Sequence, residues 1–189
     1  MIKPGQTIEH PVTGERMTFL KTSAETNGEY VLVELELDPG GFVAAPHVHP
    51  YQEETFEILA GRVGFKAGDR EWVALPGSVV TVPRGTPHKF WNAGDQTARF
   101  RTEVRPALQF EQLIETMFTL AQDGKVNRKG MPNPLRLAVI AKAHFDDVRL
   151  PFPPVWMQRA GLALGAPVGR LVGYRPTYEP AATPEPSYA

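Results

Sequence analysis

The sequence predicts a mainly β fold, a sandwich or barrel of short strands, followed by helices toward the C-terminus. Apolar and polar residues alternate over 31–38, as expected for a strand with one buried face. Turn signals rich in glycine, proline and aspartate recur at short intervals as far as residue 95. Many short strands at this spacing are typical of sandwiches and barrels. Beyond residue 107, apolar residues recur instead every three and four positions, which is the period of a helix.

Short apolar runs between the turns mark the strands of the barrel region, residues 1–106. Thr13-Gly14 separates Ile8–Val12 from Arg16–Leu20, which predicts an early hairpin. The strands predicted after it are Val31–Leu37, Thr55–Leu59, Trp72–Leu75, Val79–Val82 and Phe100–Val104.

Residues 107–174 are predicted to form a helical extension that packs on the barrel or on a partner. Leu113, Met117 and Leu120 form one apolar stripe of a first helix. Asn133-Pro134 predicts the start of a second helix, because asparagine is a good N-cap and proline suits the first helical position.

A third helical stretch is predicted over Val155–Leu164, ended by Gly165 and Pro167. It is too short and too polar to span a bilayer. Residues 175–189 contain four prolines among small polar residues, which predicts a disordered tail.

Composition narrows the function. The chain has 189 residues, a net charge of −1 and no cysteine. Disulfides and thiolate chemistry are therefore excluded, and any metal must be held by nitrogen and oxygen. No basic cluster indicates nucleic-acid binding, and no run of 18 apolar residues indicates a membrane span. The N-terminus lacks the apolar core of a signal peptide, so a cytoplasmic location is predicted.

Two glycine-bounded segments hold three of the five histidines. In the first segment, Gly41–Gly61, one residue separates His47 from His49. Because side chains alternate along a strand, both imidazoles lie on one face of an extended strand. Adjacent inward imidazoles repel when protonated and cost free energy when unpaired, and a divalent metal resolves both problems. Glu54 can return from the next strand to supply a carboxylate.

The second segment runs from Gly77 to Asn92. Pro83 and Gly85 predict a tight turn, after which His88 starts a strand and can point into the barrel. Asn92 lies on the same face as His88, two alternations later.

The first segment resembles the first motif of the cupin superfamily, G-x5-H-x-H-x(3,4)-E-x6-G, and the second resembles its second motif, G-x5-P-x-G-x2-H-x3-N. Every fixed position of both motifs is filled, and the resemblance covers roughly residues 30–105. It implies a jelly-roll β-barrel with C-terminal helices outside the motifs.

The resemblance also implies that one metal is bound inside the barrel by His47, His49, Glu54 and His88. Glu53 is an alternative ligand, because the motif allows three or four intervening residues, while the six residues before Gly61 favour Glu54. The metal is expected to be one divalent transition ion, namely iron, manganese, nickel, copper or zinc. No organic cofactor site is predicted.

The remaining conspicuous side chains have plainer interpretations. His10 and His144 have no partner at ligand spacing, and Asn92 is expected to stabilise the fold. Tyr51 and Gln52, beside the metal motif, either contact a substrate or form a surface turn. Apolar strand residues are expected to be core in the main, with pocket lining as the alternative, and these are Phe56, Ile58, Val80, Val82 and Phe90.

A six-coordinate metal held by three or four protein ligands keeps an open coordination position, which is characteristic of a catalytic site. We therefore predict a metal-dependent enzyme acting on a small organic molecule, foremost a non-haem dioxygenase, with Glu54 able to act as a base. One alternative is a cupin isomerase, decarboxylase or polyketide cyclase that uses the metal as a Lewis acid. Another is a non-catalytic cupin that binds a small molecule. A homodimer is expected because many such barrels pair edge to edge.

Overall fold

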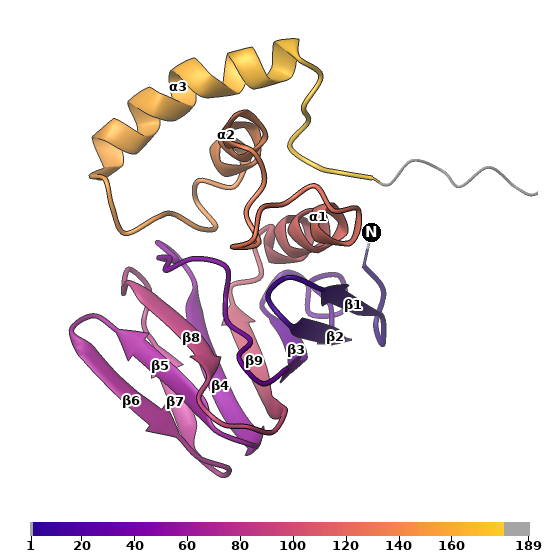
Figure 1. Ribbon diagram of the computed structural model, residues 1–189, viewed down its shortest axis with the longest axis vertical. Coiled ribbons are helices and arrows are strands. Elements are labelled where there is room, and N and C mark those ends of the chain that lie inside the picture. The colour runs from indigo at the N-terminus through magenta and orange to yellow at the C-terminus, as the bar shows by residue number, and fades with distance from the viewer. Residues whose placement is uncertain (1, 180–189) are drawn as a thin grey trace, which may run out of the picture.

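The computed structural model describes residues 2–179, which form an antiparallel β-barrel with helices gathered at one end (Figure 1). The larger sheet contains, in order, β1 (Thr7–His10), β2 (Glu15–Lys21), β3 (Val31–Leu37), β9 (Ala98–Arg105), β4 (Glu53–Ala60) and β7 (Val79–Val82). The smaller sheet contains β6 (Arg70–Ala74), β5 (Val63–Ala67) and β8 (His88–Asn92). The predicted jelly-roll class with C-terminal helices is confirmed.

The core lies between the inner faces of the two sheets. Strand β3 shows the predicted alternation, with every second residue from Val31 to Leu37 buried. Phenylalanines from both sheets meet in the core, with ring centroids 5.1 Å apart for Phe56 and Phe65 and 5.5 Å apart for Phe90 and Phe100. Because side chains alternate along each strand, these contacts fix which residues face the interior.

All the predicted strands are present, and β5 is one that the sequence pattern did not single out. This strand is only five residues long and contains Gly64, which weakens the apolar signal. The glycine is needed there, because a Cβ on Gly64 would lie 2.2 Å from the indole ring of Trp91 on β8.

The helices are α1 (Phe110–Gln122), α2 (Pro134–Ala143) and α3 (Val155–Leu171). Helix α1 packs beside β1, whereas α2 packs against α3, which is the outermost element (Figure 1). As predicted, Asn133 caps α2, because its side-chain oxygen accepts the Arg136 backbone N–H at 3.0 Å.

The predicted end of the third helix is wrong, because α3 continues past Gly165 and Pro167 to Leu171. Proline removes one backbone hydrogen bond, but packing on α2 holds the last turns in place. Ala166 and Gly169 are buried there, and a Cβ on Gly169 would lie 2.6 Å from the Leu135 carbonyl oxygen. A close contact between helices thus outweighs a local signal to stop.

Only the start of the predicted tail lies within the described residues. There the Tyr178 hydroxyl hydrogen-bonds to Asp123, and Lys125 Nζ lies 4.4 Å from the centre of the Tyr178 ring. Residues 180–189 lie outside the described residues.

Candidate metal centre

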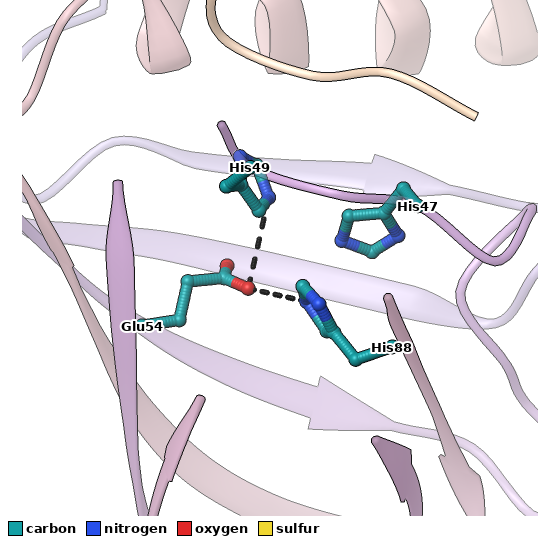
Figure 2. Close-up of side chains that lie close together, drawn as sticks. All are labelled: His47, His49, Glu54 and His88. Carbon is teal, nitrogen blue, oxygen red and sulfur yellow. Dashed lines mark hydrogen bonds and ion pairs between the residues drawn. The ribbon is translucent and has the colours of Figure 1, made fainter. Parts of the chain in front are cut away.

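The predicted ligands come together inside the barrel mouth (Figure 2). His47 and His49 lie on the segment between β3 and β4, Glu54 is the second residue of β4, and His88 is the first residue of β8. One ligand atom from each of the four residues lies within 4.8 Å of the others. His49, Glu54 and His88 are buried and His47 is half-buried.

The backbone explains why both imidazoles of the first segment face inward. His47 exchanges two backbone hydrogen bonds with His88, at 2.9 and 2.8 Å. On the opposite edge, Val48 exchanges two with Arg149, at 2.8 and 2.9 Å. Residues 47–49 are therefore an extended segment held between β8 and the helical extension, and alternation turns both imidazoles to the same side.

Each imidazole uses its Nδ1 atom for a backbone carbonyl. His47 Nδ1 lies 2.9 Å from the Ala45 oxygen, and His88 Nδ1 lies 3.0 Å from the Thr86 oxygen. His49 Nδ1 lies 2.6 Å from the Asp147 oxygen and 3.0 Å from Gln52 Oε1. Carbonyl oxygens only accept, so all three Nδ1 atoms carry a proton. This leaves the three Nε2 atoms as the ones that can bind a metal, and orients the rings for it.

Glu54 completes the cluster. Its Oε2 atom lies 2.6 Å from His88 Nε2 and 3.6 Å from His49 Nε2 (Figure 2). Glu53, the alternative ligand, is exposed on the opposite face of β4. The turn at residues 50–52 sets this facing, so the cluster contains the Glu54 carboxylate.

The electrostatics of the cluster suit a metal. Burial would raise the pKa of Glu54, but the three imidazoles together outweigh burial and lower it to about 2. Burial, and then the neighbouring imidazoles, lower the pKa of His47 to about 3. At neutral pH, Glu54 is thus ionised and His47 is neutral, which are the protonation states that metal ligands need.

His88 behaves differently from His47. Burial alone would lower the pKa of His88, but its hydrogen bond to the Glu54 carboxylate outweighs burial and raises it. The pair is thus a short ion pair when no metal separates it. An ion that binds both side chains displaces the shared proton, as is usual for metal sites.

The donor set and its spacing fit one divalent transition metal. Imidazole nitrogens and a carboxylate oxygen suit zinc, iron, manganese, nickel or copper. With metal–ligand distances of about 2.0–2.2 Å, two ligands of one ion lie at most about 4.4 Å apart. The separations of up to 4.8 Å are close to this limit, so small side-chain movements let all four residues hold the same ion.

A cavity of about 500 Å³ adjoins the cluster, and His47, His49 and Glu54 form part of its wall. Most of the other lining residues are apolar and come from both the barrel and the helices. Of the strand residues noted in the sequence, Phe56 and Phe90 line this cavity, whereas Ile58, Val80 and Val82 belong to the core alone.

Sequence reasoning missed the contribution of the helical extension. Asp147 supplies the carbonyl that orients His49, and its own Oδ1 accepts the Gln109 backbone N–H at 2.7 Å. Gln52 is buried against His49, and its amide donates to the carbonyls of Pro106 and Ala107 at 3.0 Å each. The sequence drew attention to Gln52 beside the metal motif as a substrate contact or a surface turn, but the structure buries it against His49. Nothing in the sequence pattern indicated Asp147.

The other residues singled out from the sequence lie outside the cluster. His10 and His144 are both buried, and His144 is the C-cap residue of α2. Asn92 Nδ2 donates to the carbonyls of Leu37, Asp38 and Gln96, and Asn92 Oδ1 accepts the Gly94 N–H. Asn92 therefore ties together the loops at the end of β8, as its expected fold-stabilising role requires.

Fold and cluster together define the class of this protein: a small jelly-roll barrel with a buried centre of three histidines and one carboxylate. Residues 33–104 match the protein family described as the Cupin domain. The barrel of this chain therefore contains a cupin domain.

Similar proteins include enzymes of several kinds. The probable oxidoreductase virH of Hypocrea virens is 29% identical over 179 residues, covering 85% of this chain and 78% of that protein. The polyketide cyclase RemF of Streptomyces resistomycificus is 28% identical, with a TM-score of 0.45, covering 56% of this chain and 70% of that one. A predicted oxalate decarboxylase of Thermotoga maritima is 24% identical, with a TM-score of 0.46, covering 49% of this chain and 80% of that one.

The virH match is informative for its extent. Residues 1–106 make up little more than half of the chain, so a match that covers 85% extends into the helices.

Between residues 2 and 179, no helix has the length and apolar character needed to cross a membrane. The compartment and the homodimer expected from the sequence stay predictions.

Proposed function

We propose that this protein is a metal-dependent oxidoreductase that acts on a small organic molecule, and specifically a non-haem dioxygenase. One observation carries the proposal: three imidazoles, each with Nδ1 bound to a carbonyl, present Nε2 beside an ionised carboxylate at the wall of a cavity. The similarity to a probable oxidoreductase, which extends beyond the barrel, supports it. When bound, a redox-active ion such as iron supplies the chemistry that activates dioxygen.

The chain's own residues bind, orient and exclude water. The backbone bonds of residues 47–49 fix two imidazoles before any ligand arrives, which lowers the cost of assembling the site. The apolar cavity wall keeps water away, and this strengthens electrostatic interactions at the cluster. Glu54, ionised and buried, is placed to accept a proton from a substrate hydroxyl that enters beside the cluster.

The first test needs no substrate. Untagged protein loaded anaerobically with one equivalent of iron(II) is exposed to nitric oxide, which occupies the coordination position that dioxygen uses. We expect the electron paramagnetic resonance signal of a high-spin iron–nitrosyl centre in the native chain and its loss in His88→Ala. Stoichiometric iron without this signal would contradict an open, oxygen-accessible site.

A second candidate is an isomerase or cyclase in which the metal acts only as a Lewis acid. The mainly apolar cavity favours it equally, because a folded substrate can be held there against apolar side chains. Dioxygen separates the two candidates: turnover by the zinc-loaded protein under argon would support the Lewis-acid reaction, and consumption of dioxygen by the iron-loaded protein would support the dioxygenase.

A further inference from the structure

The helical extension is a main part of the cavity wall. Of the 34 residues that line the cavity, 20 lie beyond residue 106, outside the cupin match. All three helices contribute, with Leu113 and Met117 from α1, Leu137 and Ala138 from α2, and Met157 and Leu162 from α3. The barrel thus supplies the metal centre, and the extension supplies much of the surface that a substrate meets.

The polar groups in this wall are few, and most are already satisfied. Gln158 donates to the carbonyls of Leu150 and Pro153, at 2.9 and 2.6 Å. Arg149 is the one Lys or Arg among the described lining residues, and its guanidinium is held by the Phe145 carbonyl and Asp146. The wall therefore offers no free cation to a substrate phosphate or to a second substrate carboxylate.

The hydroxyl of Thr102 is an exception. Thr102 is 3% exposed, lines the cavity, and its Oγ1 atom has no hydrogen-bond partner among the described residues. His10 Nε2, also in the cavity wall, lacks a partner too, but His10 lies on β1 against Gly130, and β2 and β3 separate β1 from β9. A buried hydroxyl without a partner costs free energy unless a ligand supplies one.

The sheet register places Thr102 close to the cluster. On β9, Thr102 is opposite Phe56, while Val104 is opposite Glu54. Thr102 and Glu54 are therefore diagonal neighbours on the same inward face, and residues in this relation typically lie about 7–8 Å apart. A substrate bound at the cluster therefore lies beside the part of the cavity wall that contains Thr102.

From these features we infer that the substrate is a large, mainly apolar molecule with two oxygen substituents, one bound at the metal centre and the other hydrogen-bonded to Thr102. A cavity of about 500 Å³ is within the range that encloses a whole drug-sized ligand. Sugars, sugar phosphates and small dicarboxylic acids are excluded as substrates, because most of their polar groups would face apolar side chains. The inference rests on the proposed function, since the metal centre receives the first oxygen.

The test uses two fluorescent probes of this class, 2,6-dihydroxynaphthalene and 2-naphthol, with glucose 6-phosphate as the polar competitor. Binding is titrated to the full-length, zinc-loaded chain. We expect both naphthols to bind and glucose 6-phosphate not to displace them. Thr102→Val should weaken binding of the dihydroxy probe about 3- to 10-fold, which is the range of one hydrogen bond. Binding of 2-naphthol should be unchanged. Thr55→Val, which removes an exposed hydroxyl from the outer face of β4, should change neither.

A second pair of variants tests the helical wall. Leu137→Trp fills the cavity from α2 and should weaken both naphthols at least 10-fold with unchanged zinc content, whereas Leu135→Trp, on the exposed side of the same helix, should not. Full zinc occupancy with displacement of the probes by glucose 6-phosphate would overturn the substrate class and leave the metal centre standing. If Thr102→Val binds each probe with the same affinity as the native chain does, the role of Thr102 would be overturned. Naphthol binding that is sensitive to Leu137→Trp in a chain that never binds metal would support the apolar class and refute the proposed function instead.

Discussion

The cleanest test of the metal centre is His47→Ala, because this imidazole contributes least to the protein without metal. The His47 side chain is half-buried and makes one hydrogen bond within the described residues, from Nδ1 to the Ala45 carbonyl, with no ion pair to Glu54. Its lowered pKa keeps the ring neutral above about pH 3, so no charge pairing is lost with it. We expect the metal-free variant to lose about 1–2 kcal/mol of unfolding free energy, one net hydrogen bond plus some packing.

The effect on the metal-bound protein should be larger. At a free metal concentration 100 times the native Kd, binding stabilises the native chain by about 2.7 kcal/mol. Loss of a ligand should weaken binding at least as much as the 10- to 100-fold typical of lost outer-shell partners. If the affinity falls 100-fold at the same free metal concentration, binding stabilises the variant by only about 0.4 kcal/mol. For a chain of this size the difference corresponds to a metal-dependent Tm shift smaller by about 5–9 °C.

The assay is differential scanning calorimetry with and without metal, paired with metal analysis of the dialysed protein. His10→Ala is the matched control, because His10 is buried and packs edge-on against Phe118 outside the cluster. The control should lower Tm but keep the full metal-dependent shift. If His47→Ala keeps the full shift and full metal content, the assignment of His47 as a ligand is wrong.

Three further predictions follow from single side chains. Glu54→Gln should lower metal affinity at least tenfold by equilibrium dialysis, whereas Glu53→Gln, exposed on the opposite face of β4, should not; the reverse result would transfer the ligand role to Glu53. Asn92→Ala should cost about 2–4 kcal/mol in urea unfolding, because it removes four hydrogen bonds, with unchanged metal content; a loss of metal alone would contradict its structural role. Burial raises the pKa of Glu15 from 4.5 to about 7. The stability that this side chain contributes is therefore complete below pH 4.5 and is lost as the pH rises through 7. The total loss in unfolding free energy is at most about 3 kcal/mol. Glu15→Gln should therefore gain stability over the native chain between pH 4.5 and 8, and an equal pH dependence in both proteins would refute this.

Part of the four-residue cluster could be predicted from the sequence because its geometry is local, and the resemblance to the cupin motifs implied the complete set. His47 and His49 share a face through the two-residue period of an extended chain, and His88 follows a turn defined by Pro83 and Gly85. The choice between Glu53 and Glu54 was harder, since strict alternation from His49 favours Glu53. The turn at residues 50–52 interrupts the alternation, and the structure buries Glu54 instead.

The helices show a similar division. Asn133 and Pro134 mark the start of α2 through side-chain chemistry that acts within one turn. The end of α3 depends on the contact of Gly169 with the Leu135 carbonyl on α2, and a local signal such as Pro167 carries no information about that neighbour.

By itself, the sequence determined the barrel class and the starts of the second and third helices, because each depends on a local period or cap, and its resemblance to the cupin motifs implied the four clustered side chains. Tertiary structure alone decided that the carbonyl of Asp147 orients His49 from 98 residues away, and that Thr102 faces a cavity walled by the helical extension. The physical reason is that a backbone carbonyl is present at every residue and an apolar wall is built from ordinary core residues. Neither has a distinctive residue type, so only the packing of the extension on the barrel mouth gives them a role.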